Sequence, residues 1–202
     1  MRYRSEEDKV YCYENGVLKN KFNIRNEKIL NMIEAELTSL HLADIHKNGI
    51  KGKFDFTHYK HIHKKIFGDI YPFAGKTRTV SISKGDTTFC IWMYIDEQME
   101  LIFEQIRVNI IENPNIAKLS KNDLILLISE YMVELNMIHP FREGNGRTLR
   151  EYFRLLSLYL GYQLDYSECD KYEILEADIK GVKGDLNPLV TVLEKSLKKS
   201  YS

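Results

Sequence analysis

The residues best suited to chemistry lie together in one stretch, residues 139–150, which reads HPFREGNGRTLR. A histidine and a glutamate come first, two glycines then flank an asparagine, and arginines follow. Glycine lets the backbone approach a ligand closely. A helix that begins at these glycines would present free N–H groups and a partial positive charge to a phosphate. The stretch therefore predicts a phosphate-binding turn at the start of a helix.

The charged side chains of this stretch suit phosphoryl transfer. His139 has an ordinary pKa of about 6.5, so it can act as a general base at neutral pH. Glu143 is a hard oxygen ligand of the kind that Mg²⁺ takes beside nucleotide phosphates. Arg147, Arg150 and Arg154 follow on one helical face, and the first two lie within reach of the phosphate. The alternative is an ordinary helical corner with a solvated arginine face, which a lone Gly-x-Gly would not exclude.

Helices are expected to position this turn. Apolar residues recur at three- and four-residue spacing along most of the chain, which indicates amphipathic helices, and only four prolines interrupt it. The helices expected from this spacing cover residues 26–45, 57–67, 96–110, 120–138, 144–160 and 188–198.

One segment, residues 79–92, departs from the helical pattern. It is rich in β-branched and aromatic residues around a Lys84-Gly85-Asp86 turn, which is typical of a β-hairpin. A lone hairpin is marginal in water, so this one must pack on the helices. The fold expected is mainly α, as one domain over residues 1–202 with core helices at about 26–165.

Composition excludes several classes of partner. Lys and Arg number 29, as do Asp and Glu, so the net charge is zero and no basic excess favours direct nucleic-acid binding. No apolar run approaches the roughly 18 residues of a membrane span, and no secretory signal opens the chain. Three scattered cysteines fit a reducing compartment. We expect a cytoplasmic protein that binds neither nucleic acid nor membrane.

Two other motifs are weaker. Residues 74–77 read AGKT, like the end of a P-loop, but Ile70 stands where the first glycine of that motif belongs. His58, His61 and His63 lie close together and could bind a metal, but the neighbouring lysines favour exposed polar residues.

The stretch 139–150 resembles the Fic motif, HPFx(D/E)GNGRxxR, and fits it at every defined position. Residues 67–78 resemble the F…YxWAGxxR stretch of Fic domains, with Phe73 in place of the common Trp, and the hairpin 79–92 stands where Fic proteins carry their flap. Residues 184–188 and 11–20 are similar to further Fic segments, the latter to bacterial FicT toxins and Bartonella effectors. The resemblance implies the Fic fold, a helical bundle with a small β-hairpin flap beside the active site.

The resemblance also implies an activity, protein adenylyl transfer. His139 would take the proton from a Ser, Thr or Tyr hydroxyl of a target protein, and that hydroxyl would attack the α-phosphate of ATP. Glu143 would hold Mg²⁺. The residues implied to bind the nucleotide are Arg142, Gly144, Asn145, Gly146, Arg147, Arg150, Lys84, Gly85 and Tyr172.

Within that set, residues 144–146 would form the anion hole, Arg147 would contact the inner phosphates and Arg150 the γ-phosphate. Tyr172 would contact the adenine, although packing at a helix start explains it equally well. The flap would pair with a target segment by strand addition. Its expected docking residues are Ile82, Ser83, Lys84 and Phe89.

Two alternatives to adenylyl transfer stay open. Other Fic-fold proteins transfer phosphate or phosphocholine, and Doc-type motifs carry Lys in place of the second loop glycine. Here Gly146 is retained, which favours transfer from the α-phosphate. A non-catalytic nucleotide-dependent binding module is disfavoured because it would have no need of His139.

Regulation in the family often uses a helix with the sequence (S/T)xxxE(G/N), whose Glu pairs with the second motif arginine, here Arg150. No glutamate of this chain has Ser or Thr four residues before it. The resemblance therefore implies a toxin inhibited by a small separate antitoxin that carries this helix, and a divergent inhibitory element within the chain itself stays open as the alternative. DNA gyrase and topoisomerase IV are the targets implied by the similarity to FicT toxins.

Overall fold

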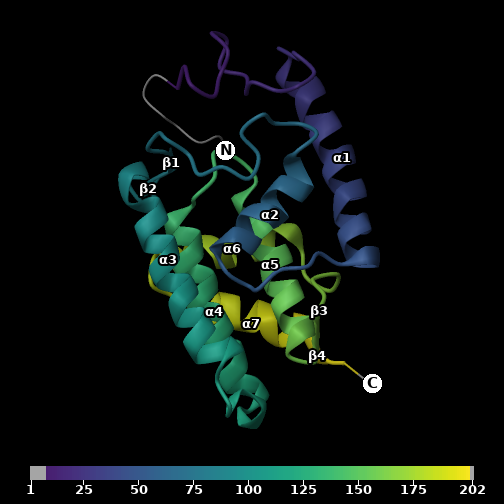
Figure 1. Cartoon of the computed structure of the whole chain (residues 1–202), viewed down its shortest axis with the longest axis vertical. Helices are drawn as coiled ribbons and strands as arrows, with labels where there is room; N and C mark the ends of the chain where they lie inside the picture. The colour runs from purple at the N-terminus through teal and green to yellow at the C-terminus, as the bar shows by residue number, and fades with distance from the viewer. Residues whose placement is uncertain (1–7, 201–202) are drawn as a thin grey trace. The chain divides into compact units, whose positions relative to one another are not determined.

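The computed structural model describes residues 8–200 (Figure 1). Contacts between residues divide them into two compact units. The first unit comprises residues 8–97 and His139–Thr148, and the second comprises residues 98–138 and 149–200. The expectation of one Fic domain over residues 1–202 stays a prediction. Seven α-helices and two pairs of very short strands lie within residues 8–200, which confirms the mainly α expectation.

Two helices that pack against each other form the frame of the first unit, α1 (Glu27–Asn48) and α2 (Phe56–Phe67). Both begin at a side-chain cap of the kind that satisfies an unpaired N–H group. Asn26 Oδ1 accepts from the N–H of Ile29 at 3.2 Å, and Asp55 Oδ1 accepts from the N–H of His58 at 2.8 Å. The apolar face of α2 is buried through Phe56, Tyr59, Ile62, Ile66 and Phe67.

The predicted flap is a hairpin, but a shorter one than expected. Strands β1 (Ser83–Lys84) and β2 (Thr87–Thr88) pair antiparallel, and the 3₁₀ helix η1 (Trp92–Tyr94) follows. The strand pair stays short because Arg78 donates hydrogen bonds to backbone carbonyls of the segments on both sides of it. Its Nη1 donates to Val80 O and its Nη2 to Cys90 O, each at 2.6 Å.

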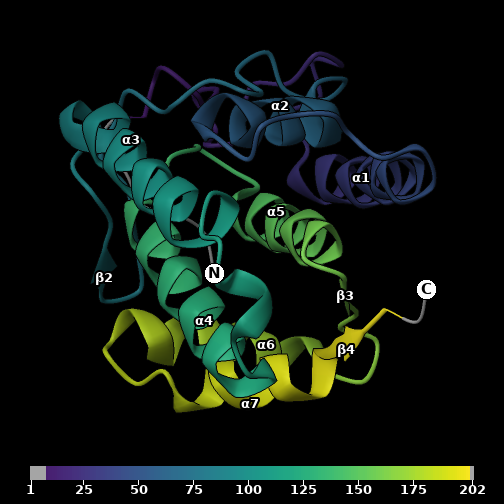
Figure 2. The same ribbon diagram turned by 60° about the horizontal axis from the view of Figure 1, so that its bottom comes forward.

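In the second unit, α6 (Lys171–Val182) and α7 (Asn187–Ser196) pack on each other and on α4 (Lys121–Ile138) (Figure 2). Strand β3 (Tyr162–Leu164) pairs antiparallel with β4 (Leu197–Lys199). The helix expected at 188–198 therefore ends at Ser196, because the chain then extends into β4.

Helix α3 (Ile95–Ile106) also ends before the limit expected for it, residue 110. It gives way to the π-helical turn η2 (Arg107–Ile111), and the 3₁₀ turn η3 (Ile116–Lys118) precedes α4. Helix α5 (Asn145–Tyr159) carries the motif arginines. Within residues 8–200 no helix combines the length and the apolarity that crossing a bilayer requires.

Candidate active site

The predicted turn before α5 is locked by the side chain of Asn145. Its Oδ1 accepts from the N–H of Phe141 at 2.9 Å, and its Nδ2 donates to the carbonyl of Phe141 at 2.7 Å. The Asn145 amide is buried, and these two bonds fix the backbone of the turn at Phe141. The first backbone bond of α5 runs from the N–H of Thr148 to the carbonyl of Gly144 at 3.1 Å. The N–H groups before it, including that of Gly146, belong to the helix start, where backbone donors lack a partner within the helix. The structure thus forms a turn at a helix start where the sequence predicts one, and phosphate binding at this turn stays a prediction.

Gly144 is required by both its backbone and its surroundings. Its φ is +82°, in the left-handed region, and a Cβ at this position would lie 2.3 Å from the ring of Phe67. Its N–H donates to Glu143 Oε1 at 2.9 Å. Any larger residue would therefore displace the turn from α2.

His139 is buried and held from two sides. Its ring stacks on Phe89 of the flap with centroids 3.8 Å apart, and its φ is +54°. Arg78 Nε donates to the carbonyl of His139 at 2.8 Å, and the N–H of Arg78 donates to the carbonyl of Pro140 at 2.8 Å. The same arginine that limits the flap therefore fixes the backbone of the candidate base.

The flap side chains differ from the expected docking role. Ile82 and Phe89 are 2% and 7% exposed, so both are core residues of the first unit. Ser83 and Lys84 are half-buried. Docking through the side chains of Ile82 and Phe89 is therefore not what this structure supports, because they already pack inside the unit. Docking through the main chain of the flap stays a prediction.

His63 braces the motif turn from α2. The N–H of Gly75 donates to its Nδ1 at 2.8 Å, so Nε2 carries the proton and donates to the carbonyl of Glu143 at 2.9 Å. Its ring stacks on Phe141 with centroids 3.8 Å apart. Burial lowers the pKa of His63 to about 4, so the ring is neutral at pH 7.

The expectation that the three clustered histidines are exposed is therefore wrong for two of them. His58 and His63 are buried, and only His61 is exposed. Nothing within residues 8–200 groups three or more His, Cys, Asp or Glu side chains as a metal site would.

Two carboxylates share Arg147. Its Nη2 lies 2.6 Å from Glu34 Oε1 and 3.7 Å from Glu143 Oε1, and its Nη1 donates to Thr38 Oγ1 at 3.3 Å. The guanidinium carbon also lies 4.6 Å from the centre of the Phe67 ring. Burial, and then the neighbouring Glu34 carboxylate, raise the pKa of Glu143.

The donor set fits a single divalent cation held with a nucleotide. Mg²⁺ commonly takes one or two carboxylates together with substrate phosphates. Glu143 supplies one carboxylate next to the start of α5, and its side chain is 29% exposed. Its Oε1 is engaged by the N–H of Gly144, which leaves Oε2 for a ligand.

Arg142 has surroundings that favour a role other than nucleotide binding. It is buried, its Nε donates to Asp8 Oδ2, and its Nη2 donates to Cys12 Sγ at 3.6 Å. These contacts tie the motif turn to the N-terminal segment.

In the second unit, Arg150 pairs with Asp178. Its Nη1 lies 3.4 Å from Asp178 Oδ2 on α6. Tyr172, at the start of the same helix, is 69% exposed and so is not packed into the unit. Arg154 pairs with Glu151 at 2.7 Å. Arg150 and Tyr172 stay predicted nucleotide contacts.

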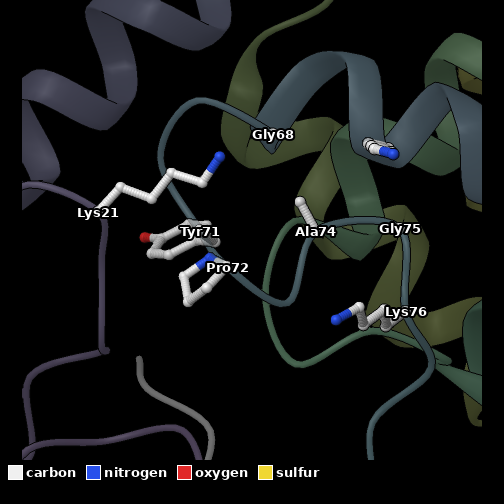
Figure 3. Close-up of a pocket in the computed structure, with 8 residues that line it drawn as sticks. Lys21, Gly68, Tyr71, Pro72, Ala74, Gly75 and Lys76 are labelled. Atoms are coloured by element: carbon white, nitrogen blue, oxygen red, sulfur yellow. The ribbon is translucent and has the colours of Figure 1, made fainter.

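A separate cavity of about 320 Å³ lies in the first unit (Figure 3). None of the residues that line it belongs to the stretch 139–150, so it is not the predicted nucleotide site. No helix begins at residues 74–77, which removes the P-loop reading of that segment. The lining residues are Lys21, Lys64, Gly68, Tyr71, Pro72, Ala74, Gly75 and Lys76.

With this geometry in place, comparison with known proteins assigns the family. A family model described as Fic/DOC matches residues 53–157, more than half of the chain. The chain belongs to the Fic/DOC family. The match contains the whole motif turn together with α2 and the flap, which confirms the resemblance found in the sequence.

Several curated Fic proteins are similar to this one. "Protein adenylyltransferase VbhT" of Bartonella schoenbuchensis is 34% identical over 97% of this chain, which spans 40% of VbhT. "Probable protein adenylyltransferase y4lH" of Sinorhizobium fredii is 33% identical over 98% of this chain and its own full length. "Probable protein adenylyltransferase Fic" of Escherichia coli is 31% identical over 89% of this chain and 86% of its own.

Solved structures agree on the Fic fold. The BepC effector protein of Bartonella tribocorum, with bound AMPPNP, superposes with a TM-score of 0.83 at 21% identity, covering 95% of this chain and 98% of its own. The type IV secretion system effector protein BepA superposes with a TM-score of 0.81 at 27% identity, covering 94% of this chain and 68% of its own. The expected helical bundle with a small flap is therefore confirmed.

Proposed function

We propose that this chain is a protein adenylyltransferase that moves AMP from ATP to a Ser, Thr or Tyr hydroxyl of a target protein. The observation that carries the proposal is the complete motif turn, in which the ring of His139 stacks on Phe89 of the flap and helix α5 begins at Asn145, directly after Gly144. Support comes from relatives named as protein adenylyltransferases, two of which match this chain over 86% and 100% of their own length. The match covers 40% of VbhT, so the rest of VbhT does not support this proposal.

The chemistry follows from these groups. The target hydroxyl oxygen forms a bond to the α-phosphorus of ATP, the bond from that phosphorus to the bridging oxygen breaks, and pyrophosphate leaves. The hydroxyl proton passes to the imidazole of His139. The N–H groups of the α5 turn and Arg147 stabilise the charge that develops on the phosphate oxygens. Mg²⁺ supplies further neutralisation of the phosphates when it is held by Glu143.

Labelled ATP in a cell lysate tests this function. Wild type should transfer label from the α-phosphate to a protein band, and His139→Ala should not. Mass spectrometry of the labelled protein then identifies the added group, because AMP, phosphate and phosphocholine differ in mass. A mass gain of phosphate or phosphocholine would replace adenylyl transfer with one of the two related reactions, and no gain at all would leave a binding module.

Flap docking forms a second part of the proposal. A target segment in extended conformation would add to the β1–β2 pair through main-chain hydrogen bonds, with Ser83 and Lys84 at its edge. Replacing Lys84 and Gly85 by two prolines should reduce target labelling while ATP affinity stays within about twofold, because proline removes N–H donors. An equal loss of ATP affinity would show that the hairpin supports the nucleotide pocket instead.

Inhibition in trans forms the third part. A small antitoxin with an (S/T)xxxE(G/N) helix would place its Glu on Arg150 and stop transfer, since an Arg–carboxylate pair in a desolvated site is strong. Expression of the chain alone should then harm the cell, and expression of His139→Ala should not. Deleting the chain from residue 188 onward tests the reverse case. A tenfold rise in activity of the folded, shortened protein would mean that inhibition is in cis.

A further inference from the structure

We propose that Glu34 is a positioning residue that holds the Arg147 guanidinium against α1, so that Arg147 does not close its 3.7 Å separation from the Glu143 carboxylate and Glu143 stays available to the divalent cation. This inference rests on the proposed function, because it assigns Glu143 to the metal. Neither the motif nor its spacing points to Glu34, which lies more than a hundred residues before Arg147 in the chain.

Distances within the first unit carry the argument. Arg147 Nη2 could pair with either of two carboxylates, and it lies 2.6 Å from Glu34 but 3.7 Å from Glu143. Glu143 is four residues before Arg147, at the spacing where side chains on consecutive turns meet. In the absence of Glu34, this neighbour is the carboxylate nearest to the guanidinium. An arginine that moved onto Glu143 would neutralise the charge that a cation needs.

Further contacts make the hold on Arg147 directional. Thr38 lies one turn after Glu34 on α1, and its hydroxyl donates to the carbonyl of Glu34 at 2.7 Å, so its oxygen accepts from Arg147 Nη1. The Phe67 ring lies against the guanidinium face. Glu34 and Thr38 thus each accept from one guanidinium nitrogen of Arg147, and Phe67 covers one face of the group. These three contacts define the position of the planar guanidinium.

Glu34 is also held by a partner other than Arg147. The hydroxyl of Tyr71 donates to Glu34 Oε2, so the other oxygen, Oε1, is the one directed at Arg147. The Glu34 side chain is 14% exposed, and its Arg147 partner is 27% exposed. Water therefore competes only weakly for this contact, and a carboxylate held by a second partner does not follow the arginine if the arginine moves.

The test compares Glu34→Gln with a matched control, Glu36→Gln, an exposed glutamate on the same helix. The first readout is the Mg²⁺ concentration that gives half-maximal self-labelling or target labelling with α-labelled ATP. Glu34→Gln should raise it at least fivefold, and Glu36→Gln should leave it within twofold. Combining Glu34→Gln with Arg147→Ala should shift it no further than Arg147→Ala alone, because both changes remove the same contact.

The second readout needs no metal, nucleotide or activity. In the ¹⁵N spectrum of arginine side chains, the Nη signals of Arg147, assigned by their absence in Arg147→Lys, should be resolved in the wild type because its guanidinium is fixed. They should broaden or average in Glu34→Gln and persist in Glu36→Gln. If Glu34→Gln does not fold, Thr38→Val tests the same hold through Nη1 and should shift both readouts in the same direction by a smaller amount.

Three results would overturn the proposal. They are an unchanged Mg²⁺ requirement in Glu34→Gln, additive effects in the double variant, and activity that rises at every Mg²⁺ concentration, which would make Glu34 a brake. A wild-type protein that transfers no AMP would contradict the proposed function instead, and the arginine spectra would then decide on the hold by themselves.

Discussion

The two motif arginines stand one turn apart on α5, yet the two units hold them differently. In the first unit Arg147 meets a carboxylate at 2.6 Å, a hydroxyl at 3.3 Å and an aromatic face. In the second unit Arg150 meets one carboxylate, that of Asp178, at 3.4 Å. The first unit fixes its arginine, and the second leaves its arginine free to adjust. That contrast suits the proposed roles, in which Arg147 would contact the inner phosphates and Arg150 the γ-phosphate.

The same bracing recurs around the other motif residues of the first unit. His139 rests on Phe89 and on the Arg78 hydrogen bond, and the turn behind it rests on His63 and Asn145. A catalytic group held in this way does not have to be oriented at the moment of reaction, which is where positioning contributes to rate. Four experiments test the contrast between the units.

The largest effect is expected from His139→Ala. Loss of a general base typically costs about 10²–10⁴-fold in rate, whereas ATP affinity should change by less than threefold, because the base acts on the target hydroxyl. Initial labelling rates and calorimetric ATP titration measure the two quantities. Labelling within a few-fold of wild type would show that the braced histidine is not the base.

Arg147→Ala and Arg150→Ala test the contrast directly through stability. Removing Arg147 leaves the poorly exposed Glu34 without its cation, so the free energy of unfolding should fall by about 1–3 kcal/mol. Removing Arg150 should cost less than about 1 kcal/mol, as for the loss of one long ion pair. Urea unfolding measures both values. Equal losses, or a greater loss for Arg150→Ala, would break the distinction between the two units.

The free energy of unfolding should depend on pH through His63, the buried histidine that donates to the carbonyl of Glu143. Its folded pKa is about 4, below the ordinary value of about 6.5. Between these values the unfolded state binds more protons, so stability falls as pH falls through this window. Lowering the pH from 7 to 5 should cost about 2 kcal/mol through this group.

His63→Gln supplies the control for this dependence, since it keeps a side chain that can donate and accept but cannot titrate. Its urea stability should fall less than that of the wild type over the same interval. A parallel fall in both proteins would mean that other groups carry the pH dependence and that His63 is not held neutral.

The motif turn could be predicted from sequence because its parts are adjacent in the chain. Gly144, Asn145 and the arginines signal a helix start by local rules, and the helix does begin at Asn145. The long helices could be predicted for the same reason, since their apolar spacing is local. The π-helical turn of residues 107–111 was missed because the apolar spacing continues through it.

The braces could not be predicted, because each comes from a distant segment. Glu34, Thr38 and His63 meet the motif only through the packing of α1 and α2 in the first unit, and nothing near them in sequence marks that role. The β3–β4 pair escaped prediction likewise, because each strand has three residues and its partner is more than thirty positions away. For Arg78, the one indication in the sequence was its place in residues 67–78, the stretch that resembles other Fic domains.

The smallest effect is expected from Asp178→Asn, and it asks whether the second unit restrains its arginine at all. An ion pair at 3.4 Å, with side chains 31% and 14% exposed, should be worth no more than about 1 kcal/mol. If Asp178 competes with the γ-phosphate for Arg150, its neutralisation should raise ATP affinity by about two- to fivefold. AMP affinity should not change, because AMP has no γ-phosphate. Glu176→Gln on the same helix, whose partner is the solvent-exposed Lys180, is the matched control and should change neither affinity. A fall in ATP affinity in Asp178→Asn would mean that Asp178 orients Arg150 as Glu34 orients Arg147, and the two units would then hold their arginines by the same principle.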